Sequence, residues 1–338
     1  RDGSSKFGAN SRYGIFPSIG FAWVASEEAF VQNIIRPDML KFRASWGLNG
    51  NQEIGDYQFV SIIDKTRGYT FGGGRDVGAS PLFIENADIR WEQSEQYNFG
   101  IDLGVLNNRL QASVDFYIKN TKDLLERIPI PAHVGNDGPI ANVGSVQNSG
   151  IELALSWRHK AGQVKYNVGI NGAYNKNEVT YIGNEEKALV GASWAIAGPI
   201  TRAEEGLPIG FFYGYKTDGI FQNQAEVDAY PTINGFVQPG DLRFVDINND
   251  GVIDDDDRTD IGNPLPTATM GMNISFDYKN FDFAAYAFAS VGNEIVRNYE
   301  RNQKLTNKTV YDLDRWIGEG TSNTIPRATI GATSNTLF

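Results

Sequence analysis

The 338-residue sequence contains no cysteine and only two histidines, His133 and His159. Without cysteine there are no disulfide bonds, thiolate metal sites or cysteine nucleophiles. Because the two histidines lie in unrelated contexts, a zinc site built on histidine is not expected either. The motifs G-x-S-x-G, H-E-x-x-H and the phosphate-binding P-loop are also missing. The sequence therefore predicts a chain that is not an enzyme.

Positive charge is also scarce, with 30 lysines and arginines against 41 acidic residues and a net charge of −11. A nucleic-acid partner is excluded, because binding to phosphates needs a basic surface. No apolar run approaches the ~20 residues of a membrane-spanning helix. The strands of a membrane β-barrel carry no such runs, so low hydropathy does not exclude the membrane.

What the sequence does contain is two-residue alternation of apolar and polar side chains. In one segment Leu110, Val114 and Phe116 fall on one face, while Gln111 and Asp115 fall on the other. This pattern predicts strands in Ile15–Trp23, Lys41–Gly47, Tyr97–Leu103, Arg109–Ile118, Ile151–Arg158, Val164–Tyr174 and Met272–Tyr278. Several of these segments approach the ~9–11 residues that a tilted strand needs to cross a bilayer.

The connections between the predicted strands are of two kinds. Short turns at Leu106–Arg109 and Tyr278–Phe281 suit antiparallel hairpins, whereas other connections are long, polar and rich in glycine. This asymmetry is typical of outer-membrane barrels, and aromatic residues lie near the strand ends, where interfacial girdles occur. We predict an all-β fold: an antiparallel transmembrane β-barrel segment with long extracellular loops, whose apolar face meets lipid and whose polar face lines the lumen.

Residues 1–338 are expected to form a single, partial barrel domain. Residues 182–266 would be a long extracellular loop region, interrupted by short strands. Short helices are expected only at Gln224–Tyr230 and Asp312–Ile317. A soluble β-sandwich remains the structural alternative, since its strands also alternate.

One loop has the spacing of a calcium site. Calcium loops place oxygen ligands at positions 1, 3, 5, 7, 9 and 12, with glycine at position 6. The segment 246–257 fills this pattern with glycine at Gly251 and with Asp246, Asn248, Asp250, Val252 (through its carbonyl), Asp254 and Asp257. We predict a structural Ca²⁺ ion here, anchored by an inward Ile253. The alternative is a solvated acidic turn, and aspartate rather than glutamate at position 12 weakens closure of the site.

An aromatic cluster that includes Phe212, Tyr213 and Tyr215 offers candidate substrate contacts. Aromatic faces stack on the apolar faces of sugar rings. The same residues could equally serve packing within the barrel wall and its loops, and that interpretation is favoured.

Six segments, in order along nearly the whole chain, resemble the SusC/RagA-like branch of the TonB-dependent transporters. They are RYGIFPSIGFAW at 12–23, LKFRASWGLNGNQEIG at 40–55, NADIRWEQSEQYNFG at 86–100, NVGSVQNSGIELAL at 142–155, GLPIGFFYGYKTDGIFQ at 206–222 and GDLRFVDINNDGVIDDDDRTDIGNP at 240–264. The opening RDGSSKFG is similar as well.

The resemblance implies a complete protein in the bacterial outer membrane, with a many-stranded barrel and an N-terminal plug. It would import a bulky nutrient, glycan or peptide, without catalysis. Its partners would be TonB and a SusD-like surface lipoprotein, besides the lipid bilayer. The alternative is a secreted, calcium-stabilised, β-rich glycan-binding module or hydrolase.

This chain departs from the family pattern at both ends. By this resemblance, residues 1–338 are expected to lack the plug and the TonB-interacting segment, and further strands are expected after Ile325–Thr329. Phe338 is not expected to be a terminal barrel aromatic, because Ala332, Ser334 and Thr336 give no apolar strand face.

Overall fold

The computed structural model describes residues 1–128, 130–191, 193–194, 198–233, 237–296, 309–329 and 335. Ala332, Ser334, Thr336 and Phe338 therefore lie outside the described residues. The chain divides into two compact units. The first comprises Arg1–Lys187, Glu204–Leu207 and Pro266–Val291, and the second comprises Ala188–Ala203, Pro208–Leu265 and Gly292–Phe338. Whether 1–338 acts as a single barrel domain stays a prediction.

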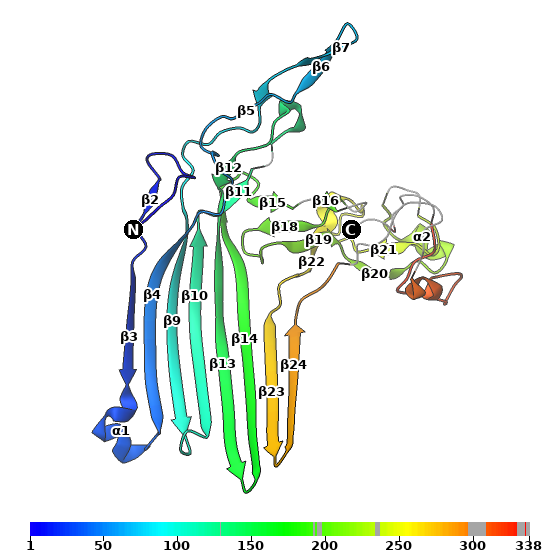
Figure 1. Cartoon of the computed structure of the whole chain (residues 1–338). Helices are drawn as coiled ribbons and strands as arrows, with labels where there is room; N and C mark the ends of the chain where they lie inside the picture. Colours follow the sequence, from blue (N-terminus) through cyan, green and yellow to red (C-terminus); the bar gives the residue numbers. More distant parts are fainter. Residues whose placement is uncertain are drawn as a thin grey trace. The chain divides into compact units, whose positions relative to one another are not determined.

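The first unit contains an eight-stranded antiparallel sheet, whose strands lie side by side in chain order (Figure 1). They are β3 (Ser18–Val24), β4 (Met39–Asn51), β9 (Glu92–Val105), β10 (Leu110–Lys122), β13 (Gly144–Ala161), β14 (Val164–Ile182), β23 (Ala268–Tyr278) and β24 (Phe281–Val291). Each of the seven predicted strands overlaps one of these, which confirms the alternation signal. The first prediction began too early, because Pro17 has no N–H for a ladder and β3 starts after it.

Hairpin turns join the strands at one end of the sheet. The turn between β9 and β10 places Leu106, Asn107 and Asn108 at positive φ, and the pair Val105–Leu110 closes it. Lys279 takes the same left-handed conformation, at φ 53°, between β23 and β24. These two turns were predicted and are confirmed. The third hairpin, with Gly162 at φ 63° between β13 and β14, was not foreseen.

Most strands are longer than the alternation predicted. β13 and β14 contain 18 and 19 residues, and their extra length lies at the ends away from the turn. Directly after Tyr174 both faces of β14 are polar, with Asn175, Lys176 and Glu178. A pattern that depends on apolar residues ends where the side chains become polar, although the backbone ladder continues.

Long connections leave the opposite end of the sheet and carry short elements of their own. In the first unit these are β1 (Asp2–Gly3), β2 (Tyr13–Gly14), β5 (Ile63–Asp64), β6 (Gly68–Phe71), β7 (Gly74–Val77), β8 (Ser80–Pro81), β11 (Leu125–Arg127), η2 (Ala132–Val134) and β12 (Ile140–Asn142). The β3–β4 connection lies instead at the end of the hairpin turns, and it contains η1 (Ala25–Glu27) and α1 (Ala29–Ile34) (Figure 1). A small core of Phe7, Ile54, Ile89 and Trp91 packs among the connections.

The second unit holds a four-stranded sheet in the order β15 (Ala188–Val190), β18 (Thr201–Glu204), β19 (Phe211–Tyr215), β22 (Arg258–Gly262). Its other elements are β16 (Ser193–Trp194), β17 (Gly198–Pro199), β20 (Thr217–Ile220), α2 (Gln224–Ala229), β21 (Leu242–Phe244), η3 (Asp255–Asp257) and η4 (Val310–Asp314).

Of the two predicted short helices, Gln224–Tyr230 matches α2, with Asn223 as its N-cap. The one expected at Asp312–Ile317 is a 3₁₀ turn, η4, which starts earlier and ends at Asp314. Among the described residues, no helix is both long and apolar enough to span a membrane.

Candidate functional site

The eight-stranded sheet has two chemically different faces. Strand pairing aligns the side chains of Phe42, Ile101, Val114 and Leu153 in one row across β4, β9, β10 and β13. One residue further along the strands, Arg43, Gly100, Asp115 and Glu152 form the next row, on the other side. Because successive side chains point to opposite faces, the middle of these strands has an apolar face and a polar face.

The apolar face is not covered by a second sheet. Phe116, Leu153 and Ile170 each leave 43% of their surface exposed. Along β14 the apolar side chains run from Val164 to Tyr174. At ~3.3 Å per residue and a tilt of ~40°, that stretch spans roughly 25 Å perpendicular to a bilayer. This height matches the apolar band of an outer-membrane barrel and disfavours the soluble sandwich, which would bury the same residues.

A three-strand ion network occupies the polar face. The Arg43 guanidinium on β4 binds Asp102 on β9 through Nε and Nη2, at 2.8 and 2.9 Å. It also contacts Asp115 on β10, with Nη1 2.8 Å and Nη2 2.9 Å from the two carboxylate oxygens. Ser113 lies between the carboxylates, with Oγ 3.0 Å from Asp102 and 3.1 Å from Asp115. One cation thus joins three adjacent strands by geometry suited to a planar guanidinium.

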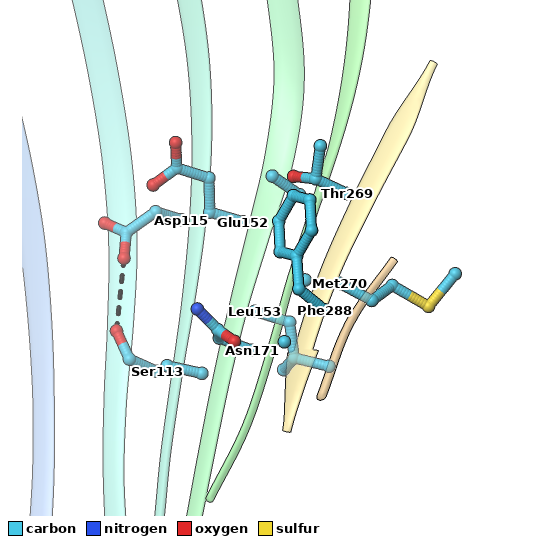
Figure 2. A pocket seen from close by; sticks show the side chains of 12 residues that line it. Ser113, Asp115, Glu152, Leu153, Asn171, Thr269, Met270 and Phe288 are labelled. Atoms are coloured by element: carbon cyan, nitrogen blue, oxygen red, sulfur yellow. Dashed lines mark hydrogen bonds between the residues drawn. The ribbon is translucent and has the colours of Figure 1, made fainter. Parts of the chain in front are cut away.

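Beside this network the polar face is hollowed (Figure 2). The hollow has a volume of about 380 Å³, and its polar lining comes from Ser113, Asp115, Glu152, Asn171 and Thr269. Phe288 of β24 also lines it, with 76% of its surface exposed. The hollow offers carboxylate, amide and hydroxyl groups next to an aromatic ring, all on one face of the wall.

Glu152 supplies the one carboxylate of this hollow that is not held by a neighbouring side chain in the described residues. Within the described part of the chain it makes no hydrogen bond or ion pair, while neighbouring Asp115 is held by Arg43. A free carboxylate near an exposed aromatic ring can contact a polar or cationic ligand. Arg43 and Asp102 were not singled out from sequence. Both residues occupy polar positions in strands whose apolar and polar residues alternate, and that much is visible in the sequence. Whether they meet is decided by the register between the strands.

The predicted calcium loop is compact in the structure. Asp246 Oδ2 accepts a hydrogen bond from Gly251 N at 2.9 Å, and Asp250 Oδ1 accepts one from Val252 N at 2.8 Å. Asn248 Oδ1 accepts from Asp250 N at 3.0 Å. Gly251 sits at φ 86°, as the sharp turn requires. Side chains 1, 3 and 5 of the pattern therefore gather around one turn.

The closing residues of that loop point inward. Asp257 is fully buried, and its two oxygens accept from Ile247 N at 2.8 Å and Asp254 N at 3.0 Å. Ile253 is buried against Ile233 and Phe244, as the sequence predicted. Among the described residues, no group of three or more histidine, cysteine or acidic side chains is arranged to hold a metal ion. Calcium binding by Asp246, Asn248, Asp250, Val252, Asp254 and Asp257 stays a prediction.

The aromatic cluster is largely engaged in packing. Phe212 exposes only 8% of its surface. The guanidinium groups of Arg202 and Arg258 lie 4.5 and 4.8 Å from the centroid of the Tyr213 ring. Tyr215 packs on Phe244. Burial, followed by the nearby Asp255 carboxylate, raises the pKa of Tyr215 to about 12. Substrate contact by these residues stays a prediction, and their positions are accounted for by packing.

An antiparallel wall with an uncovered apolar face, a polar ion network opposite, hairpin turns at one end and long connections at the other defines an outer-membrane type of β-barrel. The chain belongs to the TonB dependent receptor-like, beta-barrel family, whose model matches residues 1–317. It is of the SusC/RagA-like kind, and its place is the bacterial outer membrane.

Two curated relatives illustrate the match. TonB-dependent receptor P3 of Formosa agariphila is 32% identical over 337 residues, covering 98% of this chain and 33% of that protein. TonB-dependent receptor SusC of Bacteroides thetaiotaomicron is 29% identical over 310 residues, covering 89% of this chain and 30% of that protein. The chain therefore spans about a third of the length of the curated relatives it matches.

Solved structures give the same result. The structure of the RagAB peptide transporter matches with a TM-score of 0.80 at 26% identity, covering 99% of this chain and 36% of that one. The RagAB peptide importer in its open-open state matches with a TM-score of 0.74 at 25% identity, covering 98% of this chain and 35% of that one.

Proposed function

We propose that the complete protein imports a bulky nutrient across the bacterial outer membrane in a TonB-dependent manner. The observation that carries the proposal is the two-faced sheet: an apolar band of membrane height on one side and a polar, hollowed wall on the other. Relatives named as TonB-dependent receptors support it. The described wall does not close on itself, so transport belongs to the whole protein rather than to this portion.

The nutrient is proposed to be a glycan or a peptide. The hollow on the polar face suits either, because carboxylate and amide groups bind hydroxyls and peptide groups alike, and an exposed aromatic ring stacks on sugars and side chains. Similarity to a peptide transporter supports the peptide class. No step of bond making or breaking is assigned to this chain. A SusD-like surface lipoprotein and TonB are proposed as its partners on the strength of the family resemblance.

The test is growth of a strain that lacks the complete gene, supplied with one nutrient source at a time. We expect the deletion to abolish growth on one class of oligomeric glycan or peptide and to leave growth on the monomers unchanged. Complementation with the full-length gene should restore growth. The Glu152→Ala variant should restore it less well, while Ser156→Ala, at an equivalent polar-face position of β13 outside the hollow, should restore it fully.

Two results would overturn the proposal. One is unchanged growth of the deletion strain on every oligomer tested. The other is recovery of the native protein in the culture medium instead of the outer-membrane fraction, which would favour the secreted binding module or hydrolase.

We also propose that loop 246–257 binds Ca²⁺ as a structural clip. The spacing of its oxygen groups supports this, as does the gathering of Asp246, Asn248 and Asp250 around Gly251. The consecutive acidic residues Asp254–Asp257 repel one another when no cation is present, and a divalent ion would convert that repulsion into ligation. The ion would fix the loop without supplying any chemistry to transport.

A further inference from the structure

The hollow on the polar face is formed where small residues lie among larger ones. Ala154 on β13, Ala173 on β14 and Gly271 on β23 line it and leave its centre empty. Larger side chains stand around them, with Glu152 on the β13 side and Phe288 on the β24 side (Figure 2). All of these residues belong to the first compact unit. The hollow is therefore a property of the wall itself, and its two sides differ in chemistry.

The side formed by β24 carries aromatic rings where a polar wall is expected to carry polar side chains. Pairing with β23 places Tyr286 opposite Asn273 and Phe288 opposite Gly271, both on the polar face. Tyr286 and Phe288 expose 83% and 76% of their surface. Ala287, between them in sequence, points to the apolar face instead. Because exposed aromatic rings on a polar surface mark a contact with an apolar group, this side of the hollow suits an apolar part of a ligand.

The opposite side of the hollow is negatively charged. The charged residues that line it are Asp115 and Glu152, which lie directly across from each other on β10 and β13. Arg43 binds Asp115 from β4, and it also binds Asp102. Glu152 is exposed, and no side chain of the described residues binds it. A carboxylate left in this state attracts a cation and repels an anion.

A ligand that matches both sides has a positive charge at a short distance from an apolar group. Neutral sugars offer hydroxyl groups without charge, and acidic sugars are repelled by Glu152. A peptide supplies the combination through its amino terminus, or a lysine or arginine side chain, and an apolar side chain further along. The backbones of β13 and β24 are three strand spacings apart, roughly 14 Å, which is about the length of four extended residues. Between them the exposed amide of Asn171 can bind peptide N–H and C=O groups.

We propose that the hollow is a subsite for a positively charged peptide, with the ammonium or guanidinium group at Glu152 and an apolar side chain on Phe288. This inference rests on the proposed import function and narrows its substrate from a glycan or a peptide to a cationic peptide. The charge comes from the amino terminus or from a side chain, and the test separates these two sources.

The test uses cells that carry the full-length gene, with the deletion strain as the baseline. The cells receive a mixture of peptides of equal length, and the depletion of each from the medium is followed by mass spectrometry. The peptides share one sequence and differ in having a free or acetylated amino terminus, lysine or norleucine at one position, and phenylalanine or alanine at another. Neutral oligosaccharides are supplied in parallel.

Three variants of the full-length protein are compared with the wild type. Glu152→Gln removes the charge and keeps the size of the side chain, and Phe288→Ala removes the ring. The matched control is Asp277→Asn, which removes a carboxylate from the polar face of β23 outside the hollow. Immunoblots of outer-membrane fractions confirm equal amounts of each protein.

We expect the wild type and Asp277→Asn to deplete positively charged peptides about tenfold faster than the acetylated norleucine peptide, since hydrogen bonds between charged groups are the stronger ones. Glu152→Gln should reduce this ratio to below about twofold. Phe288→Ala should keep the ratio but lose the preference for phenylalanine over alanine. If acetylation alone abolishes the charge preference, the amino terminus is the group bound at Glu152. If norleucine alone abolishes it, the lysine side chain is.

The same charge preference in wild-type and Glu152→Gln cells would overturn the proposal. Equal slowing of charged and neutral peptides by Glu152→Gln would also overturn it, because a structural part for this carboxylate would explain that result. Depletion of an oligosaccharide but of no peptide would overturn the peptide assignment and leave the import function standing. Failure of the import function looks different, since wild-type and deletion cells would then deplete every peptide and oligosaccharide at the same rate.

Discussion

Asp257 and Asp250 have different parts in the loop 246–257. Asp257 is buried and binds two backbone N–H groups, so it holds the loop together whether or not a cation is present. Asp250 is exposed to solvent, and its Oδ1 accepts from Val252 N within the same turn. A substitution at Asp257 could therefore weaken calcium binding either by unfolding the loop or by removing a ligand. A substitution at Asp250 removes the ligand alone, because Asp250 lies at the surface.

We expect Asp250→Ala to abolish the effect of calcium on loop 246–257. In the wild-type protein, a chelator should increase cleavage of this loop by added protease. A free calcium concentration tenfold above the dissociation constant should stabilise the bound loop by roughly 1.4 kcal/mol. In Asp250→Ala, cleavage should be equal with and without calcium. The measurement is limited proteolysis of the intact protein, with cleavage sites mapped by mass spectrometry.

Asp255→Asn is the matched control for that experiment. Position 10 of the pattern is not a ligand position, and asparagine keeps an acceptor for the Tyr215 hydroxyl, which lies 3.2 Å from Asp255 Oδ1. This variant should respond to calcium as the wild type does. If the wild-type protein is cleaved identically in calcium and in chelator, the loop is a solvated acidic turn held by its own hydrogen bonds.

At the scale of a single strand, β13 offers neighbouring positions that test the two faces. Leu153 lies in the middle of the apolar face, in the row of Phe42, Ile101 and Val114. Glu152, the preceding residue, lies on the polar face. An arginine at a mid-membrane, lipid-facing site costs roughly 2–4 kcal/mol. We therefore expect Leu153→Arg to lower the free energy of unfolding by about that amount and Glu152→Arg to lower it far less.

The measurement is urea-induced unfolding of the full-length protein in lipid vesicles, followed by tryptophan fluorescence. The variants differ by one position and introduce the same residue, so strand propensity and side-chain size are matched. Similar losses of stability in both would contradict the assignment of faces.

The strands were predictable because apolar and polar residues alternate along each of them, and this pattern can be recognised from neighbouring residues alone. Leu110 to Ile118 alternate without a break, and the structure keeps that parity throughout β10. Short turns at Leu106–Arg109 and Tyr278–Phe281 were predictable for the same local reason. The polar outer halves of β13 and β14 were missed, because Asn148, Asn177 and Glu178 give no apolar signal and their strands are defined by ladder hydrogen bonds.

The ion network of Arg43, Asp102 and Asp115 could not be derived, since it depends on register between β4, β9 and β10. Residues 43 and 102 are separated by a long connection that sets no register from local sequence. In the second unit, the pattern at 246–257 predicted the turn at Gly251 and the buried Ile253 correctly. It did not predict that both carboxylate oxygens of Asp257 would accept hydrogen bonds from backbone N–H groups.

At the scale of the whole molecule, the sheet has two open edges. β3 and β24 are its outermost strands, and in the described residues neither pairs with the other. Unpaired backbone groups are not tolerated in the hydrocarbon region of a bilayer. We expect residues 1–338 expressed alone to form no stable pore. Reconstituted into planar bilayers, they should give no uniform, long-lived conductance, even though they carry a complete apolar face.

A homogeneous single-channel current from this portion would contradict that expectation. The full-length protein is the necessary control, because it should migrate as a folded barrel in the same lipid. Failure of both proteins would point to the reconstitution conditions, so both are measured in one preparation.

The order of strands in the sheet bears on how the wall is assembled. Within the eight-stranded sheet, each strand pairs with the next strand of the same sheet along the chain, from β3 to β24. Each hairpin can therefore form before the next one is added, and no strand has to thread between two that are already paired. Lengthening a long connection delays the arrival of the next hairpin but does not alter its own register, since the hairpin turn lies at the opposite end. The end of the wall that bears the long connections can therefore change in length without changing the order in which the strands pair.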